Sequence, residues 1–121
     1  MPYKYYNQNP FQLRLQDCVT RAISRALGID YFDVVAMLYQ NGKFNECDDL
    51  CVGCYSKLLT HDFKLPCFYG NGKTVEEVAN DFPDKILLIR VDQHLTTSRF
   101  GEIEDIWDPS YKIVDRFWIV E

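Results

Sequence analysis

Cys18 stands where the sequence predicts the first turn of a helix, which is a favourable place for a reactive thiol. Unpaired backbone N–H groups and the helix dipole favour the thiolate over the thiol at that position. A thiolate nucleophile needs a proton-transfer partner, and the chain has only two histidines, His61 and His94. We expect His94 to be the base, because it falls in a predicted strand, where the neighbouring strands would hold its ring.

A third group should orient the imidazole, and the strand that follows Gly101 offers Asp105 and Asp108. The choice between the two depends on the hairpin loop at Gly101. A loop of two or four residues places Asp105 on the same face as His94, and a loop of three residues favours Asp108. We expect Asp105 to be the orienting residue, with Trp107 shielding the pair from water, and keep Asp108 as the alternative.

Attack on a carbonyl group also needs hydrogen-bond donors for the oxyanion that forms. The backbone N–H of Cys18 supplies one donor, and a side-chain amide should supply a second. Gln12, six residues before Cys18, is the predicted donor, and Gln16 competes for the same role. Together these residues predict a thiol hydrolase or acyl transferase that acts on an amide-type bond.

The order and spacing of these residues resemble the papain-like cysteine peptidase superfamily. The gap from Gln12 to Cys18 matches the family's gap between glutamine and cysteine, and Asp17-Cys18 resembles the bacteriocin-processing peptidases. Further segments are similar to small papain-like proteins of bacteriophage and bacterial genomes: Thr74-Val75-Glu76-Glu77-Val78, His94-Leu95, 101–108 and Phe117-Trp118. The resemblance implies a Cys-His-Asp triad that cleaves or transfers a peptide or isopeptide bond in a peptide, protein or small amide substrate.

A second interpretation keeps the papain-like fold without the chemistry. A cysteine on the buried face of a helix is usually a small hydrophobic residue, and a single histidine in a sheet is common. Cys18 and His94 would then be structural residues. The protein would be a catalytically silent binding module, such as a phage-type interaction or inhibitor protein.

A third interpretation concerns the other cysteines. Cys47, Cys51 and Cys54 lie close together in the sequence, and His61 or Cys67 could complete a tetrahedral zinc site in an interaction domain. We expect no metal and no cofactor, because packing accounts for these thiols and the apolar faces of the predicted elements supply a core without one.

Composition restricts the partners and the compartment. The net charge of −5 and the sequence pI of about 4.9 are the opposite of a nucleic-acid-binding footprint, so no nucleic acid is expected as a partner. Apolar runs such as 86–89 are far shorter than the about 20 residues of a membrane span. The start of the chain lacks a signal-peptide core and the five cysteines are an odd number, so we expect a cytoplasmic protein with reduced thiols rather than a disulfide framework.

The elements that must position Cys18 are predicted as helices in the first two thirds of the chain. Apolar residues at helical spacing predict one helix that begins at Cys18 and is closed by Gly28. Asp30 caps a second helix that ends at Asn41-Gly42, and a third helix covers about 52–59.

The last third of the chain, which carries His94, has the pattern of strands. Thr74 and Glu77 form a capping box that opens a short fourth helix, which Pro83 ends. Four segments rich in β-branched and aromatic residues follow, at 85–91, 95–100, 102–107 and 112–120. Helices first and strands second predict a single α+β domain over 1–121, with N-terminal helices packed on a C-terminal antiparallel sheet and residues 1–10 as a flexible leader.

Overall fold

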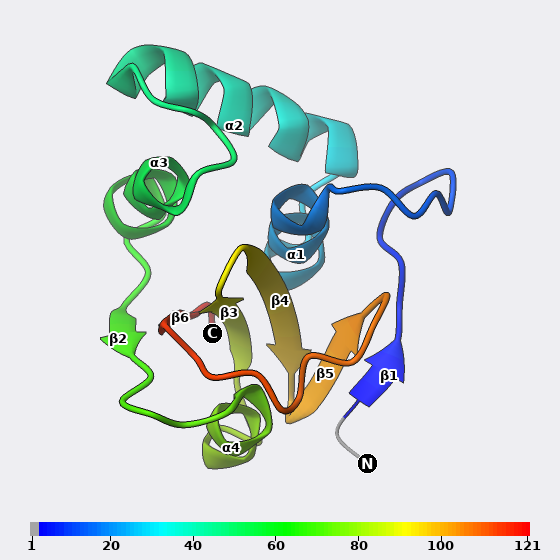
Figure 1. Cartoon of the computed structure of the whole chain (residues 1–121). Helices are drawn as coiled ribbons and strands as arrows, with labels where there is room; N and C mark the ends of the chain where they lie inside the picture. Colours follow the sequence, from blue (N-terminus) through cyan, green and yellow to red (C-terminus); the bar gives the residue numbers. More distant parts are fainter. Residues whose placement is uncertain (1–2) are drawn as a thin grey trace.

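A six-stranded sheet runs through the computed structural model, which describes residues 3–121 (Figure 1). The strands are β1 (Tyr3–Tyr5), β2 (Cys67–Tyr69), β3 (Ile86–Val91), β4 (His94–Arg99), β5 (Glu102–Asp105) and β6 (Arg116–Ile119). The helices are α1 (Cys18–Leu27), α2 (Tyr31–Asn45), α3 (Val52–Lys57), a π-helical turn η1 (Leu58–Asp62) and α4 (Val75–Asp81). The strand order is β1-β5-β4-β3-β6-β2, so the expected α+β class is confirmed.

The first helix begins and ends as the sequence predicts. Helix α1 starts at Cys18 and stops at Gly28, which has a left-handed φ of 68° and donates its backbone N–H to the carbonyl oxygen of Ser24. Glycine adopts this conformation without the steric cost that other residues meet. The residue before the helix, Asp17, makes no side-chain capping bond, which leaves its carboxylate free for other partners.

The second helix is longer than predicted. Asp30 caps α2 as expected, by accepting the N–H of Phe32, but the helix continues past Asn41-Gly42 to Asn45. Asn41 is buried and donates its amide to the carbonyl oxygen of Cys54 at 2.9 Å. Gly42 permits a close approach, since a Cβ there would lie 2.9 Å from the carbonyl oxygen of Cys47. Both residues are therefore needed for packing, and they do not end the helix.

The predicted third and fourth helices are both present. Helix α3 and the turn η1 together cover Val52–Asp62, slightly more than the predicted 52–59. The capping box at the start of α4 is complete, because Thr74 accepts the N–H of Glu77 at 3.2 Å and Glu77 accepts the N–H of Thr74 at 2.9 Å. The start of the fourth helix is thus set by a local signal, and the backbone N–H groups of Val75 and Glu76 also bond to Lys112 and Ser110.

The hairpin between β4 and β5 has one of the two loop lengths that favour Asp105. Phe100 and Gly101 both have positive φ, at 54° and 83°, and Arg99 pairs with Glu102 across the loop. This is a two-residue hairpin loop of the kind that suits the twist of antiparallel strands. In this register Asp105 comes opposite Thr96, so Asp105 and His94 belong to the same face of the sheet.

The sheet is mixed, and not antiparallel as expected. β1 pairs in parallel with β5, with Tyr3 opposite Ile103, and β2 adds an antiparallel strand beside β6. The flexible leader expected over 1–10 is also not what the structure has: Tyr3–Tyr5 form a strand, and Asn7 and Asn9 are buried. Met1 and Pro2 lie outside the described residues.

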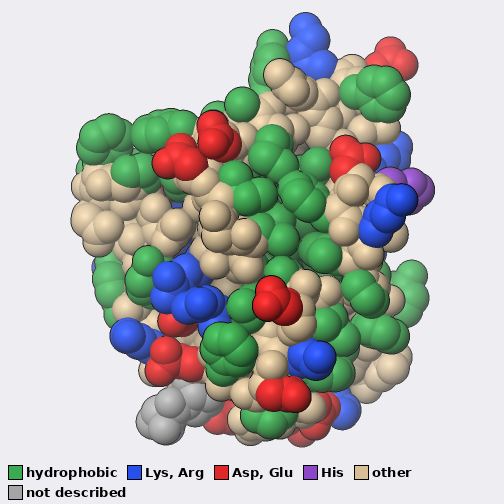
Figure 2. Space-filling view, turned by 180° about the vertical axis from the view of Figure 1, so that it is seen from behind, with side chains coloured by type: hydrophobic (Ala, Val, Ile, Leu, Met, Phe, Trp, Pro, Cys, Tyr) green, Lys and Arg blue, Asp and Glu red, His purple; other side chains and the backbone are tan. Residues whose placement is uncertain are grey.

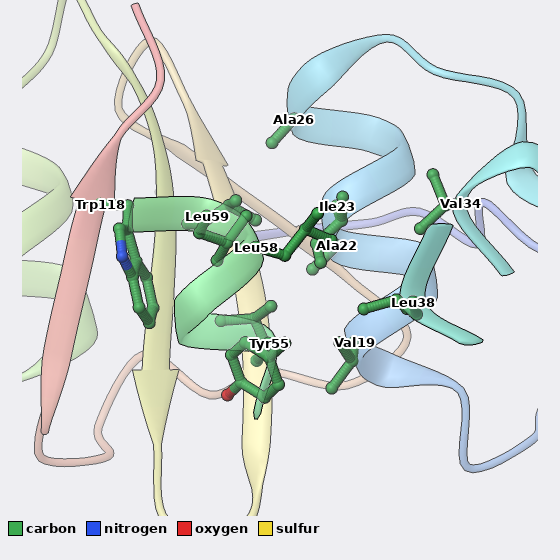
Figure 3. Packing of buried hydrophobic residues seen from close by; sticks show 12 residues of the cluster. Val19, Ala22, Ile23, Ala26, Val34, Leu38, Tyr55, Leu58, Leu59 and Trp118 are labelled. Atoms are coloured by element: carbon green, nitrogen blue, oxygen red, sulfur yellow. The ribbon is translucent and has the colours of Figure 1, made fainter. Parts of the chain in front are cut away.

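Two apolar layers hold the helices on the sheet. The larger layer joins α1, α2, α3 and η1 to one face. In Figure 3, Trp118 of β6 lies beside Leu58 and Leu59 of η1, and the α1 side chains lie between these residues and Val34 and Leu38 of α2. The smaller layer joins α4 to the other face through alternate residues of β3, β5 and β6, such as Leu87, Ile89 and Ile103. Alternation of side chains along the strands supplies both layers at once. Helix α1 is thereby held directly against β4.

The outer surface is not uniformly polar. Figure 2 shows hydrophobic side chains gathered in the middle of the face opposite to the view of Figure 1, with charged side chains scattered around them. Within residues 3–121 no helix combines the length and the apolar character that crossing a bilayer requires.

Candidate active site

Cys18 lines a cleft of about 590 Å³ at the N-terminal end of α1. Four parts of the chain form its walls: the segment that enters α1, the start of α3, the turn between β3 and β4, and the residues after β5. The lining residues with polar or reactive side chains include Gln16, Cys18, Cys51, Arg90, Gln93 and His94. The cleft therefore collects residues from both ends of the chain.

Packing of α1 on β4 brings Cys18 to His94. Thr97 of β4 donates its hydroxyl to the backbone carbonyl of Ala22 at 2.9 Å, which ties the middle of the helix to the strand (Figure 1). His94 is the first residue of β4 and lines the same cleft as Cys18, and each of the two side chains shifts the pKa of the other. The thiol is thus placed against an imidazole that the sheet holds.

The same imidazole is held by Asp105. His94 Nε2 lies 2.6 Å from Asp105 Oδ2, and the Asp105 side chain is 3% exposed. The alternative residue, Asp108, accepts the backbone N–H of Ser110 instead and has no contact with His94 among the described hydrogen bonds. The ring of Trp107 lies 4.6 Å from the His94 ring, centroid to centroid, and covers it on one side.

The pKa shifts of Cys18 and His94 favour the charged pair. Burial alone would raise the pKa of the Cys18 thiol, but the neighbouring His94 and the positive charge of Arg21 hold that pKa below its ordinary value. Burial alone would lower the pKa of His94, but the hydrogen bonds and charges of Asp105 and Cys18 raise it to about 9. Both shifts mean that the thiolate and the imidazolium are favoured over the thiol and the neutral imidazole.

Arg21 is a site residue that the sequence patterns did not identify. Its side chain is 7% exposed, with Nε 2.6 Å from Asp17 Oδ1 and Nη1 3.2 Å from Asp105 Oδ1. Asp17 also accepts the hydroxyl of Tyr31 at 2.6 Å and the amide of Asn9 at 3.0 Å. The spacing of Asp17 and Arg21, four residues apart at the start of one helix, is a signal that could have identified half of this network.

The expected oxyanion donor, Gln12, does not reach the cleft. Its backbone has a left-handed φ of 57°, and its side-chain amide donates to the carbonyl oxygens of Asn7 and Asn9, each at 3.0 Å. The competing residue, Gln16, lines the cleft beside Cys18, and Gln93 lines it from the turn before His94. A side-chain amide is therefore available, but from a different position than expected.

The remaining cysteines are not all reduced. Cys47 and Cys54 form a disulfide that joins the segment after α2 to α3, which contradicts the expectation of free, individually packed thiols. Paired in this way, these two sulfurs cannot serve as thiolate ligands of the predicted zinc set. Cys51 and Cys67 are free and exposed, and His61 is exposed. Among residues 3–121 no cluster of three or more metal-ligating side chains is found.

The chain matches no protein-family model, no curated protein and no solved structure. What the site can do follows from its geometry. A buried carboxylate fixes one nitrogen of an imidazole, which leaves Nδ1 as the nitrogen available to the thiol. A thiol so placed can be deprotonated by its neighbour and can attack a carbonyl carbon in the cleft.

Proposed function

We propose that this protein is a papain-like thiol hydrolase or acyl transferase that acts on an amide-type bond of a peptide, protein or small amide substrate. Cys18 is the nucleophile, His94 the general acid and base, and Asp105 the residue that orients His94. The observation that carries the proposal is that Cys18 and His94 line one open cleft, with the His94 ring held by the buried Asp105 at 2.6 Å.

The first half of the reaction uses the thiolate. Cys18 Sγ attacks the carbonyl carbon of the substrate, and the electron pair of the C=O bond moves to its oxygen. The backbone N–H of Cys18 and the amide of Gln16 stabilise that oxyanion, Gln16 taking the role first expected of Gln12. As the C–N bond breaks, the imidazolium of His94 gives its proton to the departing amine, and a thioester remains on Cys18.

The second half of the reaction restores the enzyme. Neutral His94 takes a proton from a water molecule, whose oxygen attacks the thioester carbonyl and releases the acid. An amine that enters in place of water gives transfer. In both halves Asp105 holds Nε2 of His94, and Trp107 reduces the access of water to the pair, which strengthens the charge interactions between them.

The papain-like part of the proposal is supported by how the elements are arranged. The nucleophile begins a helix that packs on a sheet, and the histidine and aspartate lie on adjacent strands of that sheet. The order cysteine, histidine, aspartate along the chain is the one that the resemblance implies.

Trapping of the acyl-enzyme tests the proposed function. A mixed peptide library is incubated with the wild type, and cleavage products and intact protein mass are followed by mass spectrometry. We expect cleavage and a covalent adduct on Cys18, both abolished in Cys18→Ala and in His94→Ala. Cys67→Ser is the matched control, because Cys67 is a free, exposed thiol outside the cleft, and it should retain activity.

Two results would overturn the proposed function. One is a wild type that cleaves nothing and whose Cys18 reacts with a small electrophile no faster than Cys51. The other is tight, stoichiometric binding of a peptide or protein that survives Cys18→Ser without any turnover, which would favour the silent binding module.

A further inference from the structure

The charge of the cleft differs from that of the chain. The chain has 18 acidic and 13 basic residues, yet none of the described residues that line the cleft is an aspartate or a glutamate. Two arginines line it, Arg21 and Arg90. Arg21 lies between the carboxylates of Asp17 and Asp105, so its charge is balanced inside the protein. The charge of Arg90 is not offset by these two carboxylates.

Arg90 shares its carboxylate partner, Asp115, with a second arginine. Arg90 Nη1 lies 3.1 Å from Oδ2 of Asp115, and Nε of Arg116 lies 2.8 Å from that same oxygen. Arg90 and Arg116 are directly opposite each other on β3 and β6, an arrangement in which like charges repel. One carboxylate offsets one of the two positive charges, so this cluster of three described residues keeps a net positive charge.

The Arg90 side chain is held at the cleft and remains accessible from it. Its guanidinium is held by the hydrogen bond to Asp115 and lines the cleft beside Tyr55, and 19% of its side-chain surface is exposed. The surrounding wall is apolar and includes Leu50, Val52 and Trp107. Apolar walls lower the local dielectric constant and strengthen the attraction between a guanidinium and an anion.

Arg90 lies close to the reacting groups along the hairpin. Val91 pairs with His94, and Arg90 pairs with the next residue, Leu95. Arg90 is therefore a diagonal neighbour of His94 across the two strands, and both residues line the cleft. A group bound by Arg90 would therefore belong to the part of the substrate next to the bond that Cys18 attacks.

We propose that Arg90 determines substrate specificity by binding a carboxylate adjacent to the scissile bond, while the apolar wall takes a neighbouring hydrophobic group. This inference rests on the proposed function of Cys18. The carboxylate belongs either to an aspartate or glutamate side chain or to the free C-terminus of a peptide. A guanidinium binds both in the same way, through charge-assisted hydrogen bonds.

Peptides with an N-terminal chloroacetyl group test the proposal, because the Cys18 sulfur displaces chloride from that group and forms a stable thioether. Four probes share one apolar residue and differ only in the carboxylate: a glutamate probe with its glutamine counterpart, and a free-acid probe with its amide counterpart. The second-order rate of Cys18 labelling is measured by intact mass in a Cys51→Ser background. The glutamate and glutamine probes test a side-chain carboxylate, and the free-acid and amide probes test a C-terminal carboxylate.

We expect the wild type to label at least about tenfold faster with one acidic probe than with its neutral counterpart, a preference that falls as salt screens the charge. Arg90→Gln should remove the preference, and Arg90→Lys should keep part of it. Lys73→Gln removes a positive charge just before α4, away from the cleft, and should leave the preference unchanged.

Labelling by iodoacetamide, which is small and uncharged, separates the two possible failures. If Cys18 reacts with iodoacetamide no faster than an exposed thiol, the proposed function itself is wrong. If Cys18 is activated but labels equally fast with acidic and neutral probes, or if Arg90→Gln keeps the preference, the role of Arg90 is wrong. A wild-type preference for acidic probes that is the same in low and high salt would also contradict the role of Arg90. This measurement needs no variant, so it does not depend on whether a variant folds.

Discussion

Arg21 binds the oxygen of Asp105 that His94 leaves free: Arg21 Nη1 lies 3.2 Å from Oδ1, and His94 Nε2 lies 2.6 Å from Oδ2. The backbone N–H of Ile106 also donates to Oδ1, at 2.7 Å. Burial raises the pKa of Asp105, but His94, through its hydrogen bond and charge, and the N–H of Ile106 outweigh burial and lower it. Asp105 is thus fixed in orientation and kept ionised.

Arg21→Met should destabilise the protein strongly, because it leaves the carboxylates of Asp17 and Asp105 buried without their shared cation. Loss of one partner of a buried ion pair costs about 3–5 kcal/mol in the free energy of unfolding, measurable by urea denaturation. The variant should also raise the pKa of Cys18, since Arg21 helps to lower it. Lys73→Met breaks an exposed pair with Asp81 and should change little. An equal loss in both variants would contradict the role of Arg21.

The thiol of Cys18 should react as a thiolate at lower pH than an ordinary cysteine. Alkylation by iodoacetamide across pH should give an apparent pKa below the ~8.5 of a free thiol. The measurement is made with Cys51→Ser and Cys67→Ser, since both of those thiols are free and exposed. Adding His94→Gln to that background should raise the apparent pKa, because the neighbouring positive charge is lost. A Cys18 that titrates like an ordinary thiol in the parent would refute the activated pair.

His94 should titrate near pH 9 in the folded protein, well above its ordinary value of about 6.5. Because the folded state holds the proton more tightly, His94 contributes stability that is complete below pH 6.5 and is lost as the pH rises through about 9. NMR of the two imidazoles, assigned with His61→Gln, measures the pKa directly. Asp105→Asn and Cys18→Ala should each lower it, whereas an unchanged value in Asp105→Asn would show that the contact is not maintained in solution.

The protein as purified without reductant should contain three free thiols and one disulfide between Cys47 and Cys54. Thiol counting under denaturing conditions and peptide mapping check this. Replacing both cysteines by serine opens a short loop and should lower the free energy of unfolding by roughly 2–3 kcal/mol. Five free thiols with a bound equivalent of zinc would instead restore the metal-stabilised domain as the leading interpretation.

Local signals in the sequence are enough to predict most of the elements. The capping box at Thr74 and the left-handed stop at Gly28 each act over four or five residues, so both can be recognised without knowledge of distant segments. The turn signal at Gly101 reduces the choice of aspartate to two residues, and the loop length then selects Asp105. These features place Cys18 at a helix start and His94 on a strand.

Features that depend on distant segments cannot be predicted in this way. The strand at Tyr3–Tyr5 exists because β5 offers it an edge, and nothing in its own three residues requires a strand. Gln12 has the expected spacing from Cys18, but a left-handed backbone turns its amide towards Asn7 and Asn9. The sequence gives the number of residues between two positions. The direction in which a side chain points depends on the backbone conformation of the residues between them.

The pairing of β1 with β5 sets the order in which the protein can acquire reactivity during synthesis. Tyr3 and Lys4 leave the ribosome long before their partners Ile103 and Glu104. His94 and Asp105, which act on Cys18 together with the early residue Arg21, also lie in the later part of the chain. Closing so long a loop is slow and occurs late in folding. If Cys18 is the proposed nucleophile, we therefore expect the nascent chain to hold it in a less reactive form until β5 has been made and has joined the sheet.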